Sequence, residues 1–267
     1  MPDRTRSAAT EARAMDRDFE GTTVLVTGAT GGLGSAIAER FARRGADVVL
    51  HHRSRERDAE RLAETLAAAH GVVADTVRCD LSDERDIERM FRAESPAARA
   101  TVLVNNAGTY PVAGFLDLGA DDWIAGFRLN VVAAYLCTKL AAPAMIAAGG
   151  GAIVNVTSIS ADRATPDQAP YGSSKAALRS LTRTSAVALA PHGIRVNSVS
   201  PGLVWRDGLD AEFPDGLARW SDRAPIGRAV RPREIADACT FLSSPAAAAI
   251  TGHDLVVDGG ITATSDY

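Results

Sequence analysis

The feature that most constrains the fold lies near the start of the chain, where a short buried strand runs through a glycine-rich turn into a helix. Residues 22–27 read TTVLVT, an apolar and β-branched run that is typical of a buried strand. Four glycines follow within GATGGLG at 28–34, and apolar side chains then recur at helical spacing until Gly45. The sequence therefore predicts an α/β fold that begins with a β–α unit.

The same alternation of strand and helix continues along the chain. Further strands are expected at 46–50, 72–79, 101–108, 151–158, 194–202 and 254–260. Helices are expected at 54–69, from about 82, at 121–148 with a break or bend near Pro143, around Tyr171, and at 232–242. Alternating strands and helices indicate a doubly wound, seven-stranded parallel sheet with helices on both faces. We expect a flexible leader over residues 1–20 and a single Rossmann-type domain over 21–267.

Composition excludes several classes of function. A formal net charge of −4 gives no reason to expect a nucleic acid or an anionic membrane as partner. No apolar run reaches the roughly 18 residues of a membrane span, and the first 20 residues mix arginines with acids, unlike a secretory signal. The three cysteines are scattered and the five histidines form no cluster, so we expect a cytoplasmic protein without a metal.

The glycine-rich turn indicates a nucleotide site. Gly28, Gly32 and Gly34 permit a tight turn and a close approach of backbone to phosphate, and the helix start that follows offers free N–H groups and a positive dipole end. A tight turn without a ligand is the alternative interpretation. Because the turn joins the first strand directly to a helix, its context favours a dinucleotide site.

The end of the second strand indicates which dinucleotide binds. An acid there would bind the ribose hydroxyls of NAD, whereas an arginine would accept the 2′-phosphate of NADP. The segment VVLHHRSRER at 48–57 has no acid at the strand end, and Arg53 with Ser54 can hold a phosphate. A solvated basic helix start is the alternative. NADP(H) is favoured, and NAD(H) is possible.

Tyr171 and Lys175 lie four residues apart in an expected helix and so share one face of it. A nearby cation favours the phenolate, which would tune the tyrosine as an acid. Only two of the 29 basic residues, Lys139 and Lys175, are lysines, and this points away from chance. Local spacing alone leaves open a simple surface pair.

Six motifs follow one another in a fixed order. They are TGATGGLG at 27–34, NNAG at 105–108, Asn130, Ser158, YGSSK at 171–175 and PG at 201–202. With these motifs the chain resembles the classical short-chain dehydrogenases/reductases from about residue 22 to residue 260. Within that family it is most similar to the 3-oxoacyl-carrier-protein reductase and ketoreductase-like branch.

The resemblance implies a catalytic set. Tyr171 would protonate the carbonyl oxygen as hydride arrives, with its pKa moved toward the working pH. Lys175 would supply a cation and hold the nicotinamide ribose, Ser158 would hydrogen-bond the substrate oxygen, and Asn130 would hold a water that relays protons to Lys175. The alternatives are a strand-end cap for Ser158 and a locally bonded helix residue for Asn130.

The resemblance also implies a set of cofactor contacts. They are Gly28, Thr30, Gly32, Leu33, Gly34, Arg53, Ser54, Asp80, Leu81, Asn106, Ala107, Gly108, Tyr171, Lys175, Pro201, Gly202 and Val204. Asn105 is expected to tie strands together. The sequence departs from the family after PG, where Trp205 and Arg206 stand in place of the usual threonine.

Together these observations predict an NADPH-dependent oxidoreductase that reversibly reduces a ketone, possible substrates including a 3-oxoacyl or carrier-protein thioester. The alternatives are an NAD-dependent alcohol dehydrogenase of the same family and a non-catalytic dinucleotide-binding sensor. Substrate contacts are expected from the loops at 110–115, 160–168 and 203–225, the last as a mobile lid or a helical flap. The family's usual assembly predicts a homotetramer.

Overall fold

A single parallel sheet forms the centre of the protein in a computed structural model that describes residues 17–264. Its seven strands lie in the order β3-β2-β1-β4-β5-β6-β7 and all pair in parallel. The strands are β1 (Thr23–Val26), β2 (Asp47–His52), β3 (Ala74–Arg78), β4 (Val102–Asn105), β5 (Gly151–Val156), β6 (Ile194–Pro201) and β7 (Asp254–Val257). The predicted doubly wound sheet is confirmed.

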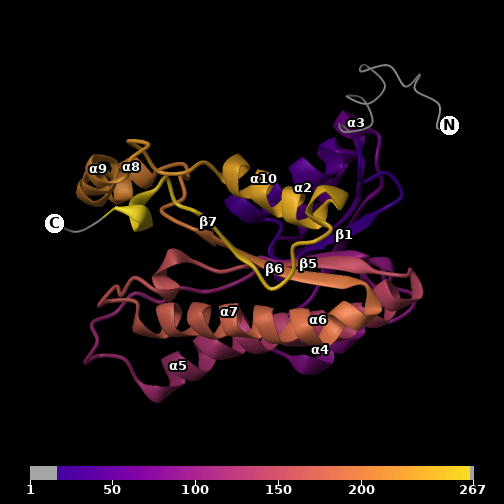
Figure 1. Ribbon diagram of the computed structural model, residues 1–267, viewed down its shortest axis with the longest axis horizontal. Helices are drawn as coiled ribbons and strands as arrows, with labels where there is room; N and C mark the ends of the chain where they lie inside the picture. Colours follow the sequence, from indigo (N-terminus) through magenta and orange to yellow (C-terminus); the bar gives the residue numbers. More distant parts are fainter. Residues whose placement is uncertain (1–16, 265–267) are drawn as a thin grey trace.

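Helices cover both faces of this sheet (Figure 1). One layer contains α2 (Gly32–Arg43), α3 (Glu56–His70) and α10 (Pro232–Ser243). The other contains α4 (Glu84–Met90), α6 (Ala133–Ala147) and α7 (Ala169–Leu189), with α5 (Ala120–Phe127) beside α7. The short helices α8 (Leu209–Glu212) and α9 (Pro214–Arg223) lie together at one end of the molecule, near the C-terminus in Figure 1.

The sheet separates two apolar cores. Successive strand side chains point to opposite faces, so Val24 and Val26 of β1 enter the core under α2 and α10, while Leu25 enters the core under α4 and α6. All three side chains are completely buried. Strands covered on both faces read as continuous apolar runs, which is why they are recognisable in the sequence.

The sequence suggested a break or bend of the long helical region near Pro143, but the helix continues through this residue. Pro143 lies inside α6, and the irregularity is a π-helical segment, η2 (Arg128–Val132), between α5 and α6. Such segments occur often at functional sites. Here the segment contains Asn130, whose side-chain partners lie outside the helix.

Part of the expected leader packs against the fold. Residues 1–16 lie outside the described residues, but Phe19 is buried in an edge-on contact with the ring of Phe41. Asp18 also forms an ion pair with Arg44 at the end of α2. The packed part of the chain therefore includes residues that the sequence assigned to the leader.

The run Ala120–Ala147 is long and apolar enough to cross a membrane by length and composition, with a mean hydropathy of 1.5. The expectation that no run reaches this length is wrong on that count. Half of its apolar window is buried inside the protein, and α6 contacts β4, β5 and α4. A core helix of a globular domain has the same properties.

Candidate active site

The candidate site lies where the strand order reverses. β1 and β4 are neighbours, and the chain leaves them toward opposite edges of the sheet. In open α/β sheets, ligands bind at the carboxyl ends of the strands at such a switch point. The glycine-rich loop follows β1, the NNAG loop follows β4, and Ser158 follows β5 by two residues.

Tyr171 stands at the start of α7, against Ser158. A hydrogen bond from Ser158 favours the phenolate, but burial is the larger effect and raises the pKa of Tyr171 above its ordinary value. The Lys175 ammonium lies 5.6 Å from the centre of the Tyr171 ring. The expected lowering of the tyrosine pKa by a neighbouring cation is therefore absent from the protein alone. A neutral phenol is the form that donates a proton.

Lys175 is held in a buried position one turn after Tyr171. Its side chain is 4% exposed, and Nζ donates a 2.7 Å hydrogen bond to the carbonyl oxygen of Val156 at the end of β5. Burial lowers the pKa of Lys175 to about 8. A lysine in this state can exchange a proton near neutral pH.

Asn130 connects three segments of the site. Its Oδ1 accepts from the backbone N–H of Thr109 at 2.8 Å, and its Nδ2 donates to the Thr109 carbonyl and to Ser174 Oγ, both at 2.9 Å. Asn130 is therefore bonded to the loop after β4 and to α7, rather than only to its own helix. A Cβ built on Gly108 would lie 2.9 Å from Asn130 Oδ1 and 3.5 Å from Lys175 Nζ, so glycine keeps the space between them open.

The glycine-rich loop is fixed by residues of the NNAG loop. Asn106 Nδ2 donates to the carbonyl oxygens of Thr27 at 2.9 Å and Gly28 at 3.3 Å. The Thr27 hydroxyl accepts in turn from the backbone N–H groups of Asn106 and Ala107. The side chain of Asn106 thus faces the loop, and among the NNAG residues it acts as a support.

The first turn of α2 can receive a phosphate. Its N-cap, Gly31, forms no side-chain cap, and the first turn contains no acid. A Cβ on Gly32 would meet nothing within 4 Å, whereas Gly34 packs closely against Gly28. The half-buried side chain of Leu33 packs against the core. The donor set of this helix start fits the pyrophosphate of a dinucleotide.

Arginines gather beyond the end of β2. Arg53 and Ser54 are exposed, as a phosphate ligand requires. Two further arginines missed by the sequence analysis lie beside them: Arg55 donates to the Thr30 carbonyl of the glycine-rich loop, and Arg78 donates to the Arg53 carbonyl. Among the described residues, none of these three arginines forms an ion pair with a carboxylate. Their charge is available to an anion.

Asp80 and Leu81 follow β3. Asp80 Oδ1 accepts from the backbone and the hydroxyl of Ser82, and these hydrogen bonds lower the pKa of the carboxyl, with a smaller contribution from Arg53. Leu81 is buried in the core under α4. Asp80 is thus a carboxylate held in place near Arg53, and the side chain of Leu81 is part of the apolar core.

The end of β6 is covered by the short helices. Pro201 and Gly202 pair with Val257, and Val204 forms an isolated bridge with Val230. A Cβ on Gly202 would lie 2.7 Å from the indole of Trp220 in α9. The 203–225 segment is therefore a helical flap seated on the PG turn.

The residues that replace the family's threonine are accounted for separately. The backbone N–H of Trp205 donates to the Val230 carbonyl at 2.7 Å, and its side chain is partly exposed. Arg206 forms an ion pair with Glu212 of α8. Arg206 is engaged within the flap.

Large apolar side chains are exposed on the segments that follow β4 and β6. Tyr110 makes an edge-on contact with Tyr171, with ring centres 6.1 Å apart, while most of its surface stays exposed. Phe115 and Leu116 of the same loop and Phe213 of the flap are also exposed. These side chains suit an apolar or mixed substrate.

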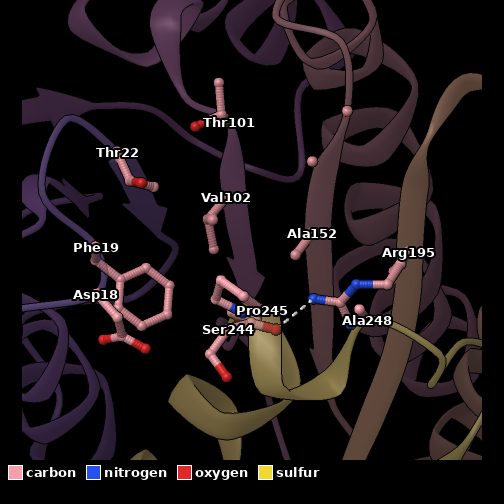
Figure 2. Close-up of a pocket in the computed structure, with 13 residues that line it drawn as sticks. Asp18, Phe19, Thr22, Thr101, Val102, Ala152, Arg195, Ser244, Pro245 and Ala248 are labelled. Carbon is pink, nitrogen blue, oxygen red and sulfur yellow. Dashed lines mark hydrogen bonds between the residues drawn. The ribbon is translucent and has the colours of Figure 1, made fainter. Parts of the chain in front are cut away.

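One cavity, of about 260 Å³, lies away from these residues (Figure 2). It is lined by residues at the amino ends of β4 and β5, including Thr101 and Ala152, whereas the candidate site lies at the carboxyl ends of the strands. Figure 2 shows Arg195 reaching across it to Ser244, and the guanidinium donates to carbonyls at the end of α10. Arg195, which lines the cavity, therefore binds the carboxyl end of α10.

Metal ligands are not grouped in the described residues 17–264, where no cluster of three or more histidines, cysteines or acids could hold an ion.

Asn105 takes the supporting place that the sequence predicted. It is buried between β4 and β5 and donates to Asn155 Oδ1 at 2.8 Å.

Comparison with known proteins agrees with this arrangement. Residues 28–262 match the family model described as Enoyl-(Acyl carrier protein) reductase. The cis-4-hydroxycyclohexanecarboxylate dehydrogenase of Sinomonas cyclohexanicum is 40% identical over 93% of this chain and 100% of that protein. The 3-oxoacyl-(acyl-carrier-protein) reductase FabG of Aquifex aeolicus is 34% identical over 92% of this chain and 100% of that protein. A solved short chain dehydrogenase/reductase family protein superposes with a TM-score of 0.83 at 40% identity, covering 92% of this chain and 100% of its own.

The fold and the site define an oxidoreductase of the dinucleotide-binding α/β class. The chain belongs to the short-chain dehydrogenase/reductase family. It is an NAD(P)-dependent enzyme acting on an alcohol or ketone.

Proposed function

We propose that this enzyme reversibly reduces a ketone to a secondary alcohol with NADPH, using Ser158, Tyr171, Lys175 and Asn130. The observation that carries the proposal is the half-buried phenol of Tyr171, which has a raised pKa and a hydrogen bond with Ser158, beside the buried side chain of Lys175. These groups converge where the sheet presents its ligand site.

The proton step follows from the state of Tyr171. When bound, NADPH would supply the hydride that the carbonyl carbon accepts. Tyr171 donates its phenolic proton to the carbonyl oxygen, and Ser158 positions that oxygen by a hydrogen bond. The resulting phenolate is stabilised by Lys175, one helical turn away. In the reverse direction the phenolate accepts the alcohol proton.

Reprotonation of Tyr171 uses the groups behind it. Lys175, with a pKa of about 8, can release and regain a proton near neutral pH. Asn130 Oδ1 and Lys175 Nζ both lie close to the position that a Cβ on Gly108 would occupy, at 2.9 Å and 3.5 Å. The open space at Gly108 suits a water between them, which would connect Lys175 to solvent.

The arginines support NADPH over NADH. Arg53 and Ser54 would hold the 2′-phosphate, joined by Arg55 and Arg78, because an unpaired guanidinium gains most from a phosphate monoester. Gly28, Thr30, Gly32, Leu33 and Gly34 would border the pyrophosphate, and the helix start described above fits it. Asp80, Leu81, Ala107 and Gly108 would border the adenosine, and Pro201, Gly202 and Val204 the nicotinamide.

The substrate is proposed as a small ketone with apolar surface. The relatives named above act on a cyclohexane carboxylate alcohol and on a 3-oxoacyl thioester, so neither substrate is fixed for this chain. A carrier-protein thioester would require a basic docking face near the catalytic residues. Arg179, one helical turn after Lys175, is instead paired with Asp162 and Asp254.

A homotetramer is supported by large apolar side chains that several helices and one edge strand leave exposed. Val132, Tyr135 and Val187 are exposed on η2, α6 and α7, and Phe241 with Val256 on α10 and β7. Such faces commonly mark protein interfaces. We place the enzyme in the cytoplasm, since its three cysteines are buried free thiols. Light scattering of the purified protein measures the assembly directly.

The cofactor and the reaction are tested together by following NADPH and NADH oxidation side by side. The carbonyl panel contains 3-oxoacyl thioesters, cyclic ketones, quinones and α-diketones. We expect turnover with NADPH at a kcat/KM at least about tenfold above that with NADH, which corresponds to one charge-assisted phosphate contact. A preference for NADH would favour the NAD-dependent alcohol dehydrogenase instead.

A further inference from the structure

His51 is the second-to-last residue of β2 and forms two hydrogen bonds with the glycine-rich loop. Its side chain is 3% exposed. The ring Nδ1 accepts a 2.9 Å hydrogen bond from the backbone N–H of Gly28, and the His51 carbonyl accepts one of the same length from the N–H of Ala29. One residue thus binds two successive amides of the turn that leads from β1 to α2.

The second ring nitrogen of His51 contacts a different segment. Nε2 lies 3.0 Å from the carbonyl oxygen of Cys79, the residue before Asp80. A carbonyl can only accept, so Nε2 carries the proton and donates it. Nδ1 is then free to accept from Gly28, and the two partners fix a single neutral tautomer. Burial lowers the pKa of His51 to about 4, which keeps this tautomer at neutral pH.

The charged and titratable groups around His51 do not override this state. His52 on the same strand opposes protonation, while Asp80 and Asp86, near the end of β3 and on α4, favour it less strongly than burial opposes it. Cys79 contributes its carbonyl, and burial raises the pKa of its thiol to about 12. The ring therefore faces no ion pair and works by hydrogen bonding.

Gly28, which His51 contacts, begins a tight turn whose own backbone supplies the hydrogen bond from the Gly31 N–H to the Gly28 carbonyl. Gly28 has a φ of +66°, a conformation that few residues other than glycine adopt. Its N–H points to His51 inside the protein, and the amides at the start of α2 are left for a ligand. Fixing Gly28 and Ala29 therefore orients the amides that follow them.

We propose that His51 is a positioning residue for the cofactor: its neutral Nε2–H tautomer fixes the glycine-rich loop to the end of β3 and thereby sets dinucleotide affinity. The proposal rests on the proposed dinucleotide site and adds a residue that does not touch the ligand. It predicts an effect on binding of the cofactor and little effect on the chemical step.

The test compares three variants of the full chain by fluorescence titration with NADPH. His51→Phe keeps a buried ring but leaves Gly28 N–H and the Cys79 carbonyl without partners. We expect a Kd about tenfold or more above wild type, and a KM for NADPH raised in proportion with kcat within about twofold. His51→Gln can restore the acceptor for Gly28 and should recover part of the affinity.

Val49→Ala is the matched control. Val49 lies two residues earlier on the same face of β2, is 1% exposed and packs in the core under α4 and α6, whereas Ala29 of the loop packs in the other core. We expect it to lower the unfolding temperature and leave the Kd for NADPH unchanged. If His51→Phe loses stability but binds NADPH as Val49→Ala does, His51 is only a core residue and the proposal is wrong.

A measurement on the unaltered protein covers the case in which the His51 variants fail to fold. Nitrogen-15 NMR of the imidazole should show a protonated Nε2 and a bare Nδ1 at pH 7, with no titration down to pH 5.5. A protonated Nδ1, or titration near pH 6.5, would overturn the proposal. Wild-type protein that binds neither NADPH nor NADH would instead overturn the proposed cofactor function.

Discussion

Gly34→Ala and Gly32→Ala separate the two roles that glycine plays in the loop after β1. A Cβ at Gly34 would lie 2.2 Å from the carbonyl oxygen of Gly28 and 2.9 Å from Ala29 Cα, both of them backbone atoms. Ordinary contacts of this kind are near 3.5 Å, so the loop or α2 must move by more than about 1 Å. Overpacking of this size costs about 1–3 kcal/mol, and a protein of this length should lose roughly 2–12 °C in Tm.

Gly32 provides the control from the same loop. A Cβ there meets nothing within 4 Å, and alanine is favoured over glycine in a helix by up to about 1 kcal/mol. Gly32→Ala should therefore keep or raise Tm, measured by calorimetry, and weaken NADPH binding only if the pyrophosphate approaches this backbone. Equal Tm values for Gly34→Ala and wild type would refute the packing argument.

Three further predictions concern the surroundings of the site. The pKa of His51 falls from 6.5 to about 4 on folding, so the folded state binds fewer protons than the unfolded state between these pH values. The free energy of unfolding should therefore fall by about 3 kcal/mol as the pH is lowered from 6.5 to 4. Urea titrations at several pH values should show a weaker pH dependence of this free energy in His51→Gln. Asn105→Ala leaves Asn155 Oδ1 without its donor and should cost about 1–3 kcal/mol in the same assay; a loss below about 0.5 kcal/mol would contradict the role given to this buried pair. Arg78→Ala should raise the Kd for NADPH about threefold or more and leave that for NADH unchanged, whereas equal changes would remove Arg78 from the phosphate site.

The sheet and its helices were predictable because their signal is local and repeated. Buried parallel strands read as apolar runs, and each is followed by a helix with its own periodicity. The position of the glycine-rich turn between the first strand and the first helix follows from the same local pattern. The predicted strands run a few residues too long, as for β3 and β7, which the structure places at Ala74–Arg78 and Asp254–Val257.

The parts that were missed depend on partners distant in the sequence. The π-helical segment at Asn130 is tied to Ser174, which lies 44 residues later, so helix periodicity gives no sign of it. His51 reads as a strand residue until the sheet places it against Gly28 and Cys79. The contribution of Arg78 appears only when β3 pairs with β2.

The raised pKa of Tyr171 was also beyond the sequence. The four-residue spacing to Lys175 suggested a cation acting on the phenol, but Lys175 Nζ is bonded to Val156 instead. Burial therefore dominates the tyrosine in the protein alone. A reductase benefits, because its acid must be protonated before it acts.

The measurement that tests the account most directly compares wild-type enzyme with Tyr171→Phe, using NADPH oxidation on the carbonyl substrate that the panel identifies. General acid catalysis accounts for about 10²- to 10⁴-fold in rate, so kcat should fall by at least about a hundredfold while the Kd for NADPH stays within about threefold. Tyr135→Phe removes a phenolic hydroxyl from α6 but keeps the aromatic ring that the proposed interface would use, so this variant should retain full activity. If Tyr171→Phe turns over at more than about a tenth of the wild-type rate, Tyr171 is not the acid and the proposed mechanism is wrong.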